Sequence, residues 1–137
     1  MKYIAMVILD RNTEAAGNYE AGMPPDAKLE TAMDKHIDEM TKAGVLLEAV
    51  GLLPLAKGAR VWAAGGKLTV TDGPFIESKE VVGGYAILRA KSKEEAVELG
   101  KAFMKLHLDA LGPSYEGTVE VRQIFDPADF EPQKRKK

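Results

Sequence analysis

Cysteine is absent from this chain of 137 residues, and histidine occurs only twice. Without thiols the chain can form neither a disulfide bond nor a thiolate zinc site, and it offers no cysteine nucleophile. His36 and His107 fall on different expected helices and leave a metal ion without an obvious ligand set, so we expect no metal site. The sequence also lacks a glycine-rich phosphate loop and a dinucleotide-binding fingerprint, and we therefore expect no cofactor.

A large excess of positive or negative charge is absent as well. The net charge is −2 and no basic stripe is present, which argues against binding to nucleic acid. The apolar stretch over residues 1–9 is too short to span a membrane, and it has neither the basic region nor the cleavage site of a signal peptide. We therefore expect a cytoplasmic protein with no membrane segment.

The length is close to that of the commonest single domains, which have enough residues to bury a sizeable core. We expect one domain over residues 1–126 and a separate C-terminal tail over residues 127–137. The basic end of that tail, residues 133–137, is interpreted as a solvated terminus, with an interaction segment as the alternative.

The spacing of apolar residues predicts a series of strands interrupted by a pair of helices. The expected strands cover residues 2–9, 45–51, 60–64, 67–71, 82–90 and 118–125. Gly65 and Gly66 favour a tight hairpin between the third and fourth of these strands, because such a turn needs positive φ. Residues 10–25 are polar and end in two prolines, so we expect a long loop there.

Both expected helices carry signals at their ends. Asp26 is a good N-cap for the first helix, and Gly44 can adopt the left-handed conformation after its last turn. Ser92 and Glu95 form a capping box at the start of the second helix, which Gly112 ends. The apolar stripes of the two helices contain Leu29, Met33, Ile37 and Met40, and Ala96, Leu99, Phe103, Leu106 and Ala110.

Without the hairpin, the order of elements is βαββαβ, which predicts an α+β fold of the ferredoxin-like class with an inserted β-hairpin. Both helices would then cover one face of an antiparallel sheet. The other face would keep apolar side chains from the strands at residues 2–9, 45–51 and 82–90. Such a patch favours association, so we expect a homodimer in which two sheets pack face to face.

Motifs spread along the chain resemble those of the YCII-related family, in its subgroup with a DGPF signature. The matching stretches are residues 42–47, 58–61, 71–75, 77, 79–80, 83–85, 92–96, 120–122 and 129–130, and the signature itself is Asp72-Gly73-Pro74-Phe75. The resemblance implies a dimeric α+β barrel of the ferredoxin-like class. It implies little about chemistry, because related folds include isomerases, lyases and monooxygenases.

The chain departs from the family pattern at two points. Relatives carry a histidine on the first helix, which forms a proposed catalytic pair with an aspartate, and the aligned residue here is Met33. Many relatives also read Gly-Glu-Gly-Leu after that helix, whereas this chain has residues 49–52, Ala-Val-Gly-Leu, with Glu48 as the neighbouring acid. The family's proposed pair therefore does not carry over to this chain.

The DGPF stretch is the most unusual local feature. As a turn, Asp72 bonds its own backbone, Gly73 permits positive φ, Pro74 fixes φ and Phe75 is an apolar anchor. As a site, the carboxylate of Asp72 at a strand end would act as a base or bind a polar group of a substrate. Turn chemistry explains more of these residues than catalysis does.

A charged cluster follows the signature. If the loop is open, its charged side chains Glu77, Lys79 and Glu80 are solvated. If the loop folds over a pocket, Lys79 would hold an anionic substrate. Arg60 either pairs with an acid or binds a carboxylate through both of its terminal nitrogens. Gly83 and Gly84 indicate a bulge, and Tyr85 after them offers a hydroxyl to the same space.

Each histidine has a structural interpretation. His36 lies at the edge of the apolar stripe of its helix. It is either a packing residue or a general base. His107 lies beside the stripe of the second helix and is expected to be partly exposed.

Two functions remain open. The first is a small-molecule enzyme of isomerase or lyase type that performs acid–base chemistry in a pocket between the sheet and helices of a homodimer. In this hypothesis Asp72 is the base or polar anchor, His36 carries the proton, and Lys79 or Arg60 contacts an anionic group. The alternative is a non-catalytic accessory protein that binds a ligand or a partner. Convergence of Asp72 and His36 in one pocket would favour the enzyme.

Overall fold

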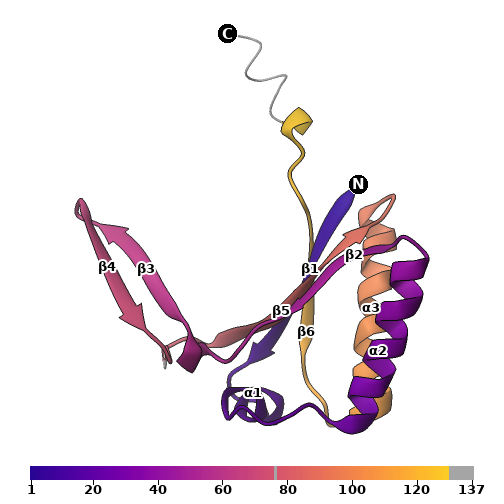
Figure 1. Cartoon of the computed structure of the whole chain (residues 1–137), viewed down its shortest axis with the longest axis horizontal. Coiled ribbons are helices and arrows are strands. Elements are labelled where there is room, and N and C mark those ends of the chain that lie inside the picture. Colours follow the sequence, from indigo (N-terminus) through magenta and orange to yellow (C-terminus); the bar gives the residue numbers. More distant parts are fainter. Residues whose placement is uncertain (76, 130–137) are drawn as a thin grey trace.

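The computed structural model describes residues 1–75 and 77–129, which form an antiparallel four-stranded sheet, a two-stranded hairpin and three α-helices (Figure 1). Phe130 of the matching stretches and the basic end at residues 133–137 lie outside the described residues. The large sheet contains β1 (Lys2–Asp10), β2 (Leu46–Gly51), β5 (Glu80–Arg89) and β6 (Thr118–Gln123), and the hairpin contains β3 (Ala59–Ala64) and β4 (Lys67–Asp72). The helices are α1 (Glu14–Glu20), α2 (Ala27–Lys42) and α3 (Lys93–Leu111), and short 3₁₀ turns cover Leu55–Lys57 and Pro127–Asp129.

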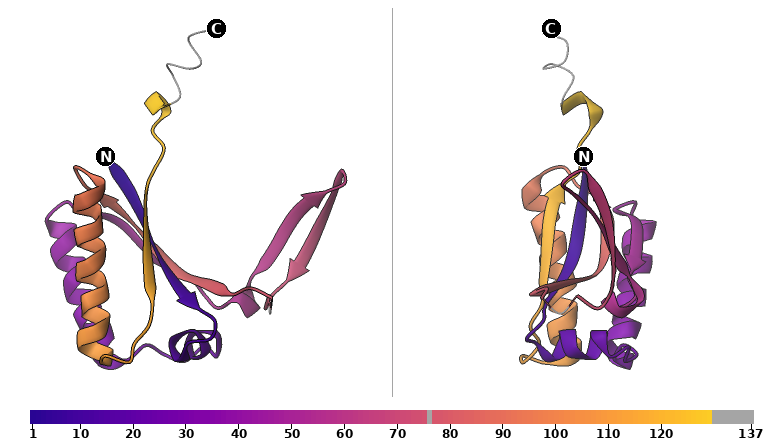
Figure 2. Two further views of the ribbon diagram at one scale, coloured as in Figure 1. Left: turned by 180° about the vertical axis from the view of Figure 1, so that it is seen from behind. Right: turned by 90° about the vertical axis from the view of Figure 1, so that its left-hand side faces the viewer.

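The strands of the large sheet lie in the order β2–β5–β1–β6, so that β2 and β6 form its edges. Helices α2 and α3 pack against each other on one face of this sheet, where α2 contacts β2 and α3 contacts β6. The β3–β4 hairpin, which we call the arm, projects on the side of the sheet away from these helices (Figures 1 and 2). The described part of the chain is thus a mixed α+β structure with one face of its sheet covered by helices.

Alternation along β1 assigns its side chains to the two faces of the sheet. Tyr3 points toward the helices and forms the core cluster with Ala90 and Ala96, against which Leu99 and Val121 pack. The neighbours of Tyr3 along β1 belong to the opposite, open face. That open face carries the half-buried apolar side chains Ile4, Met6, Ile8 and Ile87.

The expected helix ends are confirmed by hydrogen bonds and dihedral angles. The side chain of Asp26 accepts hydrogen bonds from the backbone N–H groups of residues 28 and 29, at 2.8 and 3.2 Å. Gly44 follows α2 with a φ of 76°, and Gly112 ends α3 with a φ of 95°. Ser92 Oγ accepts from the N–H of Glu95 at 3.1 Å, so this helix begins where the sequence indicates.

The prediction of a continuous loop over residues 10–25 is wrong, because α1 occupies Glu14–Glu20. Thr13 caps this helix through its side-chain oxygen, which accepts from the N–H of Ala16 at 3.2 Å. Ala16 is fully buried, and this contact with the rest of the chain stabilises a helix too short to persist alone. The sequence signal was Thr13 followed by a glutamate and two alanines.

Glycines produce two of the local irregularities that the sequence predicts. Val7 pairs with Gly84 while the next residue of β1 pairs with Val82, which leaves Gly83 as the extra residue of a β-bulge. The arm turns at Gly65 and Gly66, whose φ angles are 58° and 76°. Both the bulge and the tight turn are therefore confirmed.

The DGPF stretch uses its glycine for a different reason from the one predicted. Gly73 does not have a positive φ. Instead, a Cβ atom at this position would lie 1.8 Å from the carbonyl oxygen of Leu55. The N–H of Gly73 also donates to the carbonyl of Gly58 at 2.9 Å, so this turn presses directly on the backbone that precedes β3. Close approach, and not dihedral freedom, excludes a side chain here.

No helix within residues 1–75 and 77–129 combines the length and the apolar character needed to cross a membrane.

Gly73→Ala should lower the free energy of unfolding by about 2 kcal/mol, because the added methyl group must displace backbone atoms. Gly17→Ala in α1 is the matched control: a Cβ atom there meets nothing within 4 Å, and alanine favours the helix. Urea unfolding of both variants measures the difference. Equal stability of Gly73→Ala and the parent chain would contradict the close approach.

Candidate functional site

A cavity of about 690 Å³ lies between the sheet and the helices α2 and α3. The strands contribute small residues to its lining, so that the sheet does not reach the helices at this point. These small residues are Ala5 from β1, Ala49 and Gly51 from β2, and Gly84 and Ala86 from β5. At Gly84 the choice of glycine is enforced, because a Cβ atom would lie 2.7 Å from the carbonyl oxygen of Val50.

Residues of the predicted helix stripes form the opposite wall of the cavity. Helix α2 contributes Met33, His36, Ile37 and Met40, and α3 contributes Leu99, Gly100, Phe103 and His107. The stripes therefore line an open space in this region instead of packing onto the sheet. Exposed Met23 and Leu53 belong to the rim, where the segments after α1 and β2 meet.

Tyr19 fixes one side of this rim. Its hydroxyl lies 2.6 Å from the carbonyl oxygen of Leu52 and 2.8 Å from that of Leu53, and it donates its single hydrogen to this pair. Burial, and then the nearby charge of Glu20, raises the pKa of Tyr19 above its usual value of 10.0. The neutral hydroxyl thus ties α1 to the segment that follows β2.

His107 is buried, with 6% of its surface exposed, and the prediction that it would be partly exposed is wrong. The ring contacts that of Phe103 edge-on, with centroids 4.7 Å apart, and stacks on that of Tyr115, with centroids 5.1 Å apart. Its Nδ1 atom lies 2.9 Å from the carbonyl oxygen of Phe103. Burial lowers the pKa of His107 below its usual value of 6.5, although the hydrogen bond to Phe103 acts in the opposite direction.

His36 is half-buried and also faces the cavity, and its ring centroid lies 6.5 Å from that of Phe103. Among the described residues that line the cavity, none is an aspartate, glutamate, lysine or arginine. The cavity is therefore apolar, and the titratable side chains that face it are the two histidines and Tyr19.

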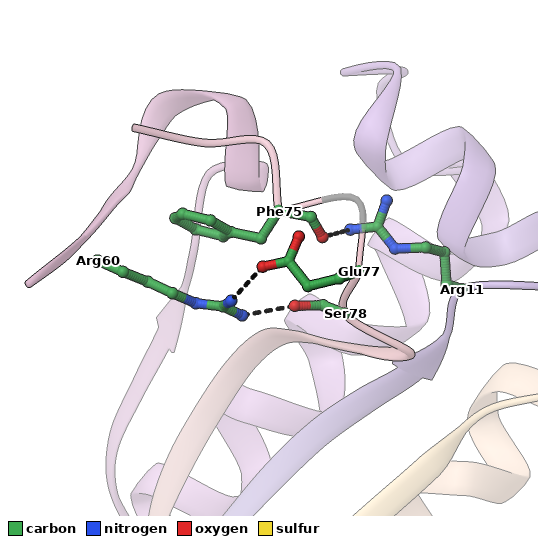
Figure 3. Close-up of polar contacts among 5 residues, drawn as sticks. All are labelled: Arg11, Arg60, Phe75, Glu77 and Ser78. Carbon is green, nitrogen blue, oxygen red and sulfur yellow. Dashed lines mark hydrogen bonds and ion pairs between the residues drawn. The ribbon is translucent and has the colours of Figure 1, made fainter. Parts of the chain in front are cut away.

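A separate polar cluster holds the base of the arm (Figure 3). The guanidinium group of Arg60 lies 4.0 Å from the centroid of the Phe75 ring, which is 5% exposed. Arg60 also pairs with Glu77 at 3.0 Å and donates to the hydroxyl of Ser78. The structure thus brings Arg60, Phe75 and Glu77 together, and Arg60 pairs with an acid, which lies in the loop before β5.

Arg11 belongs to the same cluster, and no sequence pattern pointed to it. Its Nη2 atom donates to the carbonyl oxygen of Phe75 at 3.0 Å, and its backbone N–H donates to the carbonyl of Lys79 at 2.8 Å. Its Nε atom is buried without a hydrogen-bond partner among the described residues. Arg11 and Arg60 therefore hold the loop after the DGPF stretch from opposite sides of Phe75 (Figure 3).

The remaining candidate residues lie away from the centre of the cavity. Asp72 is exposed at the end of β4, paired with Ala59 across the arm, and the arm and α2 lie on opposite sides of the sheet (Figure 1). The side chain of Lys79 is exposed. Tyr85 is a lining residue, but its pairing with Met6 directs its side chain to the open face. There its hydroxyl donates to Glu48 at 3.2 Å, and this hydrogen bond raises its pKa. Within one chain, Asp72 and His36 do not converge.

No group of three or more histidine, aspartate or glutamate side chains in the described ranges is placed to hold a metal ion.

The buried imidazole of His107 should make stability depend on pH. In the unfolded chain this group takes up a proton near its usual pKa of 6.5, whereas the folded ring resists protonation until the pH is lower. The unfolded state then binds more protons, so the free energy of unfolding should decrease as the pH falls below 6.5. Urea unfolding on both sides of this pH should show a weaker dependence in His107→Phe. Equal dependence in the two proteins would argue against a protected imidazole.

A search of curated proteins found no match. The model of the YCII-related domain matches residues 1–126, which include every strand of both sheets and all three described α-helices. This match confirms the family resemblance seen in the sequence motifs, and the chain belongs to the YCII-related domain family.

Proposed function

We propose that this protein binds a largely apolar small molecule in the cavity between its sheet and the helices α2 and α3. The observation that supports the proposal is the lining itself, in which small strand residues face methionine and aromatic side chains. A cavity of about 690 Å³ falls within the usual range for ligand sites, and such sites are mostly apolar with a few polar groups.

Within this proposal, binding without catalysis is favoured over the acid–base enzyme. The enzyme hypothesis pairs Asp72 with His36, and in one chain Asp72 is exposed on the arm while His36 lines the cavity. Lys79 and Arg60, its proposed anion contacts, do not belong to the lining either. Acid–base chemistry of isomerase or lyase type remains the second candidate, because two imidazoles face the cavity and can exchange protons with a bound molecule.

We also infer that the large sheet is ferredoxin-like, with the arm as an insertion, and that it pairs with a second copy of the chain. The order β2–β5–β1–β6 places the first and third core strands at the centre of the sheet, as a βαββαβ fold requires. The open face presents Ile4, Met6 and Ile87 to the solvent side. Two such faces, packed together, would form the dimeric α/β barrel type.

The arm supplies the second argument for a partner copy. Val61 pairs with Val70 on one side of it, and these side chains are 67% and 65% exposed. Leu68 on the same side is 79% exposed. A two-stranded hairpin is marginally stable in water, and this one lies beside the open face (Figure 2). A twofold axis would let each arm and each open face be covered by the same surfaces of the other copy.

Ligand binding can be tested with N-phenyl-1-naphthylamine, an uncharged probe whose fluorescence increases in apolar surroundings. The parent chain should bind it, and Ala86→Phe should weaken binding by roughly tenfold, about 1.4 kcal/mol, because the new ring fills the cavity. Ala102→Phe on the exposed side of α3 is the control and should bind like the parent. Unchanged binding in Ala86→Phe would place the probe elsewhere.

The pairing of two copies can be tested by sedimentation equilibrium. The parent should have about twice the chain mass of 14.9 kDa. Ile87→Glu on the open face and Leu68→Asp on the arm should shift the equilibrium toward the monomer, since each places a charge in the proposed interface. Val97→Glu on the exposed surface of α3 should remain dimeric. A monomeric parent with native circular dichroism would overturn the assembly.

A further inference from the structure

The polar atoms of an apolar cavity decide which ligands it selects, because each buried polar atom left without a partner costs free energy. The hydroxyl of Tyr19 already donates to the rim carbonyls, and that of Tyr85 donates to Glu48. His107 differs from these groups. It is buried, it lines the cavity, and one of its ring nitrogens is still available.

The hydrogen bond at Nδ1 determines what the other nitrogen of His107 can do. A backbone carbonyl oxygen only accepts hydrogen bonds, so the contact of 2.9 Å with Phe103 requires that Nδ1 carries the hydrogen. In the neutral ring Nε2 is then unprotonated and can only accept. Nε2 has no hydrogen-bond partner among the described residues. Because His107 lines the cavity, we infer that Nε2 is an acceptor that a ligand there can reach.

The surroundings of His107 hold this acceptor in a fixed orientation. The Phe103 ring meets the imidazole edge-on, and the ring of Tyr115 stacks on it. These two aromatic contacts restrict rotation of the side chain about its bonds. A ligand that reaches Nε2 therefore binds a ring that is already ordered, and little conformational entropy is lost on binding.

The lining also restricts the charge of the ligand. None of the described lining residues carries a formal charge at neutral pH when the histidines are neutral. A carboxylate or phosphate moved into this space would lose its hydration without gaining a counter-charge. Uncharged molecules avoid this cost. Their apolar portion would contact Met33, Met40 and Phe103, which form the helix side of the cavity.

We propose that the cavity selects an uncharged, mainly apolar molecule that carries a hydroxyl group, such as a phenol or an alcohol, and that this hydroxyl donates a hydrogen bond to Nε2 of His107. This inference rests on the proposed ligand-binding function and specifies its substrate class. It assigns the polar contact to His107 instead of Asp72 and the basic residues of the arm and its adjoining loop.

The test uses two probes of nearly the same shape, 1-naphthol and 1-methoxynaphthalene, of which only the first can donate a hydrogen bond. Each is measured by its displacement of N-phenyl-1-naphthylamine. The parent should bind 1-naphthol about fivefold more tightly, as expected for one net hydrogen bond. In His107→Phe, which keeps a ring but no acceptor, the two affinities should become equal. Leu108→Phe, an exposed neighbour on α3, should keep the preference.

The possible results distinguish the hydroxyl contact from ligand binding itself. Equal affinities in the parent, or a preference that persists in His107→Phe, would overturn the hydroxyl contact while leaving ligand binding intact. Failure of every probe to bind the parent would overturn both. The ¹⁵N shifts of the imidazole in the unmodified protein give a measurement that does not depend on a variant: they should report hydrogen on Nδ1, and hydrogen on Nε2 would exclude the proposed acceptor.

Discussion

The structure depends on a shortage of side-chain volume on the helix-facing side of the sheet. Where a filled core would have leucine or isoleucine, the central strands have Ala5, Ala86 and Gly84. Helices α2 and α3 still span this region because their contacts with β2 and β6, at the two edges of the sheet, hold them in place. The cavity between the sheet and the helices therefore forms because the strand residues are small and the helices are held at the two edges of the sheet. Interiors are usually closely packed, so this departure supports the proposed ligand site.

The two faces of the sheet carry different features. The helix-facing side contains the cavity and both histidines, whereas the open side carries apolar side chains and lies beside the arm. The DGPF stretch belongs to the second region. Gly73 lets the turn contact the backbone of Leu55, and Phe75 lies under the guanidinium group of Arg60. These contacts fix the direction in which the arm leaves the domain, which supports the structural interpretation of the motif.

Local signals allowed much of the fold to be predicted from the sequence, whereas the site depended on contacts that only the fold creates. Asp26 and Gly44 mark the ends of α2 because caps act over a few residues. The helix α1 was missed because its stability depends on burial of Ala16, a tertiary contact. The burial of His107 was missed for a similar reason: Tyr115, which stacks on its ring, lies beyond the end of α3. Periodicity also could not show that the arm, which ends at Asp72, and α2, which carries His36, lie on opposite sides of the sheet.

The hydroxyl of Tyr19 has a consequence for the exchange of molecules between the cavity and water. It joins α1 to Leu52 and Leu53 through one donated hydrogen, and neither of these elements contributes a strand to the centre of the sheet. Glu20 of the same helix also accepts from the backbone N–H of Leu55 at 3.4 Å, so two side chains of α1 hold the segment after β2, and the ladders of β1 and β5 involve neither of them. The position of the rim thus depends on side chains of a short helix outside the sheet, so substitutions at Tyr19 and Glu20 alter the mouth of the cavity and leave the central strands in place.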